Sequence, residues 1–410
     1  MRRAAGALAW LSILTATAAG AFDFDTSARL SLWSRPQDLS EKADVNSVQL
    51  WVRSSETWHR DELAIKFHGE GWVSHQGGDE NHALDARVRE AYVQLSDGPW
   101  ELRAGWQMFP WGRADGINPT DNLTPRQLTL LTRDLEDQRF GTPALRATWY
   151  SGPLSTSLIW LAGYKPTILP WPAGAPPYKD ITPSNPGDQV AARIELIEDK
   201  LEGSLTYFDG FDLLPTRAAL SVVGQPLVEL GHDRVRIVGA DFAKPVAKVI
   251  IRGELAHTDA GAPPAGSIFA LRPQWFAVVG AERTFGQYLD VELQSYYRRV
   301  YGAGVLGGLP AREQPLALAL VATAQQYDPV DRGLTLRVAD QWFNETLQLA
   351  VSAVSSVVRR GYLVRPVLTY RATDSWTVSL GANVFGGSDK TIYGTLKDNS
   401  AVYLEVRRGF

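Results

Sequence analysis

Polar and apolar residues alternate along most of the chain with the period of two that is typical of β-strands. In the segment 289–298, one face carries Leu289, Val291, Leu293 and Tyr297, and the other carries Asp290, Glu292, Gln294, Tyr296 and Arg298. The same alternation recurs near residues 62–73, 101–107, 145–150, 190–196, 248–255, 347–352 and 376–384. Helical periodicity is almost absent, so the sequence predicts an all-β fold.

The connections between these segments fall into two length classes. Short turns are expected at 96–99, 151–152, 198–200, 244–245, 285–287 and 373–375, and long segments at 108–142, 164–188, 209–233, 259–273, 301–314 and 386–400. Short turns at one end and long loops at the other are typical of a transmembrane barrel. The alternation of short and long breaks between residues 315 and 345. We therefore predict an antiparallel up-and-down β-barrel of about 16 to 18 strands.

The N-terminal segment has the features of a secretory signal. Arg2 and Arg3 precede an apolar stretch over residues 4–17, and Ala19-Gly20-Ala21 gives the small-x-small pattern of a cleavage site. We expect residues 1–21 to be removed and residues 22–410 to form the barrel. No later run of about 20 apolar residues predicts a transmembrane helix. An exported chain of amphipathic strands is expected in the bacterial outer membrane.

Composition excludes several classes of function. With 41 Lys and Arg against 45 Asp and Glu, the chain lacks the basic excess of a nucleic-acid-binding protein. It has no cysteine, so disulfides, thiolate metal sites and thiol nucleophiles are excluded. No Gly-x-Ser-x-Gly elbow and no His-Glu-x-x-His zinc signature occur. We predict no enzyme activity, no metal and no cofactor.

Aromatic residues are spread along the whole chain, with 14 each of Trp, Tyr and Phe. Rings at the two membrane interfaces explain most of them; this set is Trp33, Trp51, Trp72, Trp100, Trp106, Trp149, Trp160, Tyr370 and Trp376. The alternative is a sugar-stacking track inside the pore, for which the inward-facing candidates are Trp72, Tyr92, Tyr296 and Tyr403.

The segment 108–142 is long, rich in proline and densely charged. Loops of this length without regular structure are usually functional or disordered. Either the loop folds into the lumen and narrows it, or it is a surface loop with local salt bridges. If it narrows the lumen, its charges set selectivity, and the candidate constriction residues are Arg113, Asp115, Asp121, Arg126, Arg133, Asp134, Glu136, Asp137 and Arg139.

A second set of charges falls on the polar faces of predicted strands. A barrel of 16 or more strands is too wide for side chains alone to fill, so we expect these charges in an open or loop-plugged lumen. The mixture of signs predicts weak ion selectivity. The candidate pore-lining residues are Glu101, Arg103, Arg146, Arg193, Glu195, Arg252, Glu254, Glu292 and Arg298, with Arg365 and Glu405 on similar faces.

Two segments resemble a known family. Residues 105–126, GWQMFPWGRADGINPTDNLTPR, and residues 394–410, GTLKDNSAVYLEVRRGF, are similar to segments of porin-like outer-membrane barrels whose substrates are largely unassigned. The last strand ends in Phe410, an ending that resembles the signal read by the outer-membrane assembly machinery, although Arg408 departs from that pattern. The resemblance implies fold and location, and no substrate.

These observations predict an outer-membrane channel for passive or facilitated passage of a small polar solute. The alternative is a structural barrel that holds a partner protein or helps to export a polymer. The expected partners are outer-membrane lipid, the solute and the assembly machinery, and not nucleic acid. Homo-oligomerisation is left open.

Overall fold

The structure is a computed structural model that describes residues 23–39, 46–77, 84–171, 176–182, 188–221, 227–261, 268–302, 313–388 and 391–410. The predicted signal peptide, residues 1–21, lies outside these ranges.

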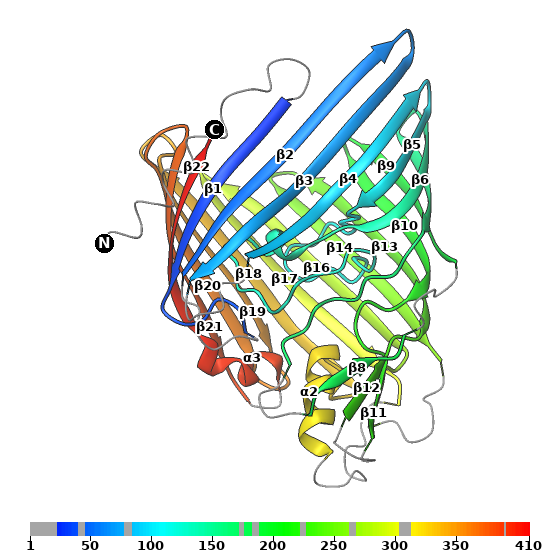
Figure 1. The fold of residues 1–410 in the computed structure, drawn as a ribbon, viewed down its shortest axis with the longest axis vertical. Coiled ribbons are helices and arrows are strands. Elements are labelled where there is room, and N and C mark those ends of the chain that lie inside the picture. Colours follow the sequence, from blue (N-terminus) through cyan, green and yellow to red (C-terminus); the bar gives the residue numbers. More distant parts are fainter. Residues whose placement is uncertain are drawn as a thin grey trace.

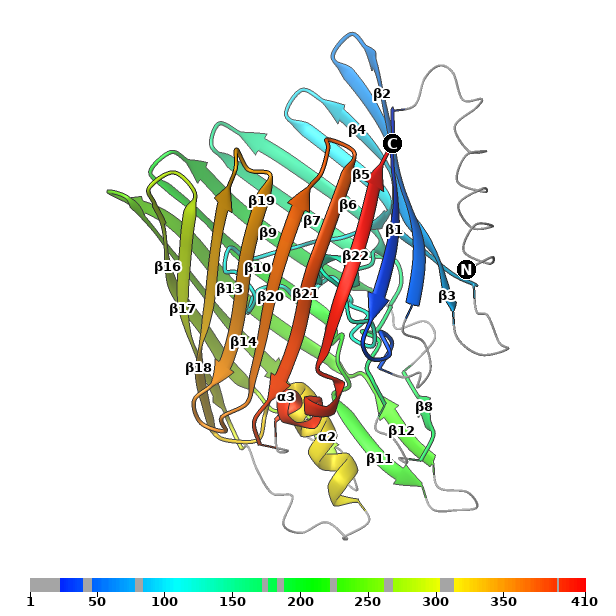
Figure 2. The ribbon, with the colours of Figure 1, turned by 90° about the vertical axis from the view of Figure 1, so that its left-hand side faces the viewer.

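Eighteen antiparallel strands form a closed barrel (Figures 1 and 2). Each strand pairs with the next along the barrel, and the first pairs with the last, from Ser27 opposite Gly409 to Trp33 opposite Tyr403. This confirms the predicted all-β up-and-down barrel of 16 to 18 strands. The strands are β1 (Asp23–Trp33), β2 (Asn46–Arg60), β3 (Leu63–Gly77), β4 (Leu84–Asp97), β5 (Trp100–Gln107), β6 (Thr142–Ser151), β7 (Leu154–Leu161), β9 (Gln189–Glu198), β10 (Leu201–Phe211), β13 (Arg234–Val246), β14 (Val249–Ala260), β16 (Gln274–Phe285), β17 (Leu289–Val300), β18 (Val330–Trp342), β19 (Leu347–Ser356), β20 (Tyr362–Arg371), β21 (Trp376–Gly386) and β22 (Ala401–Gly409).

Alternation along each strand separates an apolar outer face from a polar inner face. On β17, Glu292 and Gln294 are buried inside, whereas Leu293 between them is 51% exposed on the outside. An outer face of exposed leucine, valine and aromatic side chains is the reverse of a soluble sandwich, in which the polar face looks out.

The two ends of the barrel differ. At one end, adjacent strands are joined by short turns, such as the one between β18 and β19. The other end carries the long loops, which build structure of their own (Figures 1 and 2). There, a second sheet of four short strands is formed by β8 (Tyr178–Asp180), β11 (Arg217–Ser221), β12 (Leu227–Gly231) and β15 (Phe269–Ala270). The helices α2 (Gln314–Ala324) and α3 (Ile392–Thr395) lie at the same end.

Helix α2 explains why the predicted alternation of connections fails near residue 315. The long connection here runs from β17 to β18, residues 301–329, and not only over 301–314. The sequence of α2, QPLALALVATA, is almost wholly apolar, and its Leu-Ala repeat resembles the two-residue period of a strand. The helix forms instead, because alanine and leucine are strong helix formers.

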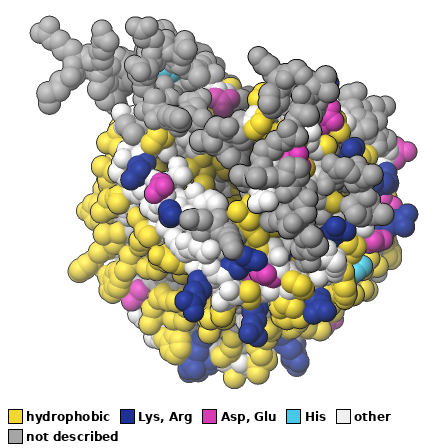
Figure 3. Space-filling view, turned by 90° about the horizontal axis from the view of Figure 1, so that it is seen from below, with side chains coloured by type: hydrophobic (Ala, Val, Ile, Leu, Met, Phe, Trp, Pro, Cys, Tyr) yellow, Lys and Arg dark blue, Asp and Glu magenta, His cyan; other side chains and the backbone are white. Residues whose placement is uncertain are grey.

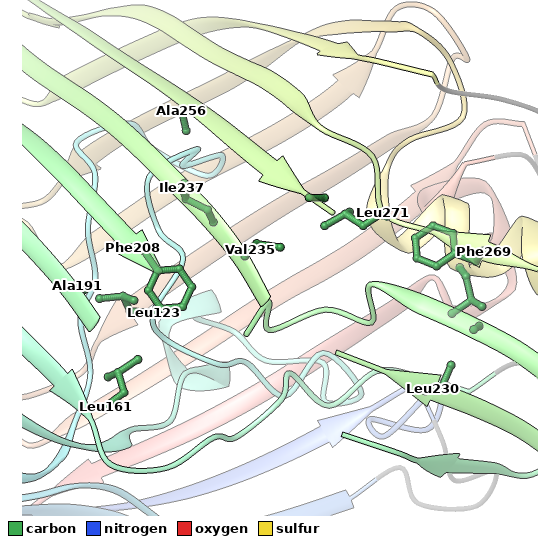
Figure 4. Packing of buried hydrophobic residues seen from close by; sticks show 14 of the residues in the cluster. Leu123, Leu161, Ala191, Phe208, Leu230, Val235, Ile237, Ala256, Phe269 and Leu271 are labelled. Carbon is green, nitrogen blue, oxygen red and sulfur yellow. The ribbon is translucent and has the colours of Figure 1, made fainter. Parts of the chain in front are cut away.

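The first part of loop 108–141, which joins β5 and β6, packs on one side of the barrel interior. Its residues Phe109, Trp111 and Leu123 belong to a buried apolar cluster that includes Ile159 on β7 and Phe208 on β10. The cluster continues into the loop end through β11, β12, β15 and α2, as Figure 4 shows for Leu123, Phe208 and Leu230 among others. Apolar burial therefore holds the loop against the β7–β14 wall.

Within the described ranges, no helix has the length and apolar character needed to cross a membrane.

Candidate functional site: the lumen and its crossing loop

Loop 108–141 is anchored to β14 through one carboxylate. Glu254 accepts hydrogen bonds from the backbone N–H groups of Arg113 and Ala114, both at 2.5 Å, and from the N–H and hydroxyl of Thr120, at 3.3 and 3.0 Å. Gly112 lies beside them with φ +95°, and an added Cβ would stand 2.5 Å from the Glu254 carboxylate. The loop backbone thus surrounds the Glu254 carboxylate with several inward-pointing N–H groups, an arrangement that binds anions.

Arg113 makes a second anchor on the same wall. Its guanidinium binds Glu195 on β9 at 2.8 Å, Glu202 on β10 at 3.2 Å and Asp241 on β13. These carboxylates raise the pKa of Arg113 against the opposing effect of burial, which is the largest single influence. A guanidinium shared by three carboxylates on three strands fixes the loop in position.

The far part of the loop is anchored to the opposite wall. Arg365 on β20 donates to the carbonyls of Thr132 and Arg133, at 2.5 and 2.7 Å. Arg133 in turn lies 3.5 Å from Glu405 on β22. Arg29 on β1 pairs with Asp137 at 2.6 Å. The loop therefore spans the lumen, from β13 and β14 to β20, β22 and β1.

Ion pairs within the loop keep its shape. Asp121 pairs with Arg126 at 2.9 Å and with Arg139 at 2.6 Å. Burial raises the pKa of Asp137, and the nearby Arg29 cation opposes this rise. These ion pairs join residues 121, 126 and 139, so they hold the middle of the loop to its end.

Two charged cavities lie beside the crossing loop in the described part of the chain. The larger one has a volume of about 940 Å³ and lies between the loop and β14–β22, with Arg252, Glu292, Arg337 and Arg371 among its lining residues. The smaller one, of about 600 Å³, lies between Asp137 on the loop and β1–β4. Both are lined mainly by charged side chains.

Cations exceed anions in the larger cavity. Nine arginines and six carboxylates line it. Most arginines are paired: for example, Arg252 lies 3.4 Å from Glu292. Among the described residues, Arg365, Arg371 and Arg407 have no carboxylate within ion-pair distance. All three line the cavity, as do Asp374 and Ser375 in the turn between β20 and β21.

The predicted constriction residues all lie on the crossing loop. Seven of the nine line the larger cavity: Arg113, Asp115, Arg126, Arg133, Asp134, Glu136 and Arg139. Asp137 lines the smaller cavity. Asp121 lines neither, because it is held between Arg126 and Arg139.

The predicted pore-lining residues separate into three groups. Arg252 and Glu292 line the larger cavity. Glu101, Arg103 and Arg146 form a ladder of ion pairs across β5 and β6, while Arg193, Glu195 and Glu254 belong to or adjoin the anchor of the loop. Arg298 lies beneath α2 and donates to the carbonyls of Ala324 and Gln325, so it does not line these cavities.

The sequence analysis did not identify some of the residues that line the inner wall. Arg337, Arg371 and Arg407 line the larger cavity, and the alternation of their strands is the signal that would have identified them. The assignment of Trp33, Trp51 and Trp72 to the aromatic rings at the membrane interfaces was wrong. All three are buried on the inner face, where Trp33 stacks on Tyr403 and the ring of Trp51 lies 6.3 Å from that of Trp72. Loop 108–141 covers this part of the wall, which explains their burial.

One group of possible metal ligands occurs in the part of the chain that the structure describes: His68, Glu70 and Glu90. Arg53 and Arg89 already bind Glu70, and the backbone N–H of Met108 donates to Glu90 at 2.8 Å. Two guanidinium groups beside the cluster oppose a bound cation. The His59, His75 and His82 combination considered in the sequence is only partly described, since His82 lies outside the described residues.

No protein-family model matches the sequence, and no curated protein does. Several solved structures match over nearly the whole chain. Pseudomonas aeruginosa OccK5 (OpdH) has a TM-score of 0.56 and 11% identity, covering 95% of this chain and 98% of that one. Pseudomonas aeruginosa OccK10 (OpdN) has a TM-score of 0.56 and 12% identity, covering 95% and 99%. Acinetobacter baumannii OccAB1 has a TM-score of 0.56 and 10% identity, covering 95% and 96%. The chain thus shares the fold of Occ-type porins, which supports a porin-like β-barrel.

Proposed function

We propose that this protein is a bacterial outer-membrane channel that lets a small polar solute pass, passively or by facilitated diffusion. The observation that carries the proposal is the charged cavity of about 940 Å³ beside a loop fixed to both walls of the lumen. A pore lined by charges holds water and passes polar solutes, and a loop across it limits their size. The porin-like fold and the exposed apolar outer face support the same function and location.

The cavity charges suggest the sign of the preferred solute. Arg365, Arg371 and Arg407 lack a carboxylate partner among the described residues, whereas most other cavity charges are paired. A local excess of positive charge raises the concentration of anions. We therefore expect a weak preference for anionic over cationic solutes, which reversal potentials in a salt gradient measure.

The loop is the element that narrows the pore, and its removal tests this role. Replacing residues 115–137 by a short Gly-Ser linker removes the anchors at Arg133 and Asp137 but keeps Phe109 and Trp111 in the apolar cluster. Single-channel conductance should rise severalfold, because the lumen of a barrel this wide then opens. Folding is checked by protease resistance and circular dichroism. Unchanged conductance in a folded variant would mean that the loop does not limit flow.

A further inference from the structure

A row of arginines faces outward at the long-loop end of the barrel. The arginine rim consists of Arg234 and Arg236 on β13, Arg299 on β17 and Arg332 on β18, and all four are exposed. Their sequence neighbours Val235, Ile237 and Arg298 are buried on the inner face, at 2, 5 and 7% exposure. Since side chains alternate between faces along a strand, the rim arginines lie on the outer wall and not in the lumen.

The rim lies at the edge of the apolar outer band. From Arg236 to Lys244 on β13, and from Arg332 to Asp340 on β18, the strand advances by eight residues. The outward residues between them are all apolar: Val238, Ala240 and Phe242 on β13, and Leu334, Leu336 and Val338 on β18. Eight residues of tilted strand rise about 20 Å, close to the roughly 25 Å apolar band of a membrane barrel. The arginines therefore stand at headgroup level.

Half of the rim has no acidic partner. Asp209 pairs with Arg234 and lies 3.4 Å from Arg236, and Asp259 stands opposite Arg236 in the strand register. Arg299 and Arg332 make no ion pair with any described residue. Counting both acids, the rim keeps an excess of two positive charges, and this excess lies on β17 and β18.

Aromatic side chains flank the two unpaired arginines. Trp275 on β16 is directly opposite Arg299, and Tyr297 on β17 is directly opposite Arg332. Both rings are exposed on the outer face, at 40 and 46%. Figure 3, viewed toward this end, shows several Lys and Arg side chains among the hydrophobic side chains at the edge of the barrel. An arginine side chain beside an exposed aromatic ring suits a ligand that carries a phosphate at one end and acyl chains at the other.

We propose that the arginine rim binds the phosphate groups of lipopolysaccharide in the outer leaflet, through its lipid A portion. This rests on the proposed outer-membrane location, with the long loops outside. Arg299 and Arg332 contact the phosphates, Trp275 and Tyr297 lie against the sugar and upper acyl chains, and the apolar band below meets the chains. Because the rim arginines lie on strands, they are held at a fixed depth in the membrane, and binding costs little conformational entropy.

The experiment titrates the refolded full-length mature chain in detergent with diphosphoryl lipid A and follows bound lipid by native mass spectrometry. Each arginine near a phosphate contributes about a fivefold gain in affinity, so R299Q/R332Q should bind about 25-fold more weakly. Arg283→Gln is the matched control, because Arg283 is also exposed and outward but lies at the short-turn end of β16. It should bind as the wild type does.

Two results would overturn the proposal: R299Q/R332Q that binds lipid A as tightly as R283Q, or wild-type protein that binds phosphatidylglycerol as tightly as lipid A. Conductance is recorded for the same preparations and should be equal in all of them, since the rim lies outside the lumen. A conducting channel that does not bind lipid A would contradict the rim alone and leave the proposed function intact.

Discussion

At the scale of single residues, the position of the crossing loop depends on a few inward contacts. Glu254 accepts from two backbone N–H groups within 2.5 Å, and this approach is possible because Gly112 has no Cβ. The backbone at Gly112 also has a positive φ, which other residues adopt only at a cost. The anchor is therefore sensitive to the addition of one methyl group.

Gly112→Ala should destabilise the folded barrel by about 1–3 kcal/mol, because it adds backbone strain and a clash with the Glu254 carboxylate. Gly116→Ala is the control: Gly116 has φ +77°, but open space surrounds its added Cβ. That variant should lose only about 1 kcal/mol. Urea unfolding of the two variants in lipid vesicles compares them, and equal midpoints would show that the clash with Glu254 has no effect.

Asp212, at the long-loop end, makes the stability of this part of the protein depend on pH. Burial raises its pKa to about 6, despite the hydrogen bond from the backbone N–H of Leu214. A raised pKa in the folded state means that the stabilising contribution is complete below about pH 4 and is lost as the pH rises through about 6. Burial lowers the pKa of the neighbouring His232, whose contribution is lost in the opposite direction, as the pH falls.

Asp212→Asn removes the carboxyl titration, keeps an acceptor for Leu214 and leaves His232 unchanged. Hydrogen exchange in β11 and β12, corrected for intrinsic rates, should show stronger protection than in the wild type at pH 7. At pH 4 the two proteins should be equal, since both side chains are then neutral. A gain of the same size at both pH values would contradict the burial of an ionised Asp212.

At the scale of elements, the strands could be predicted and the loop could not. The outer-face alternation of β17 or β9 is visible in the sequence because lipid-facing and inward residues differ in polarity. The path of loop 108–141 depends on contacts over more than a hundred residues, such as those of Arg113 with Asp241 and of Arg133 with Glu405. The sequence supplied the charges but not their partners. Helix α2 was missed because its Leu-Ala repeat imitates the period of a strand.

A cysteine-free chain allows the loop position to be tested by labelling. The side chain of Asp134 is half exposed and lines both cavities. A negatively charged methanethiosulfonate on Asp134→Cys should lower single-channel conductance by roughly half. Leu293→Cys, on the outer face of β17, should show no change. A reagent without effect at position 134, with labelling verified by mass, would place the loop away from the conducting path.

At the scale of the whole molecule, the barrel is asymmetric along its axis. Short turns leave one end simple, whereas the other carries the four-stranded sheet, α2 and α3 (Figure 2). The apolar cluster lies on the β7–β14 side of the interior, whereas the two charged cavities lie on the β14–β22 side and near β1–β4. The charged space that remains is thus off-centre, beside one loop that crosses the wide barrel.

The proposed channel is tested most directly by planar-bilayer recording of the refolded mature chain, residues 22–410, in simple salt. Stepwise, ohmic openings are predicted, because the loop crosses the lumen without filling the cavity of about 940 Å³ beside it. A protein that is folded and inserted but electrically silent would contradict the channel and would indicate a barrel that is plugged or that holds a partner.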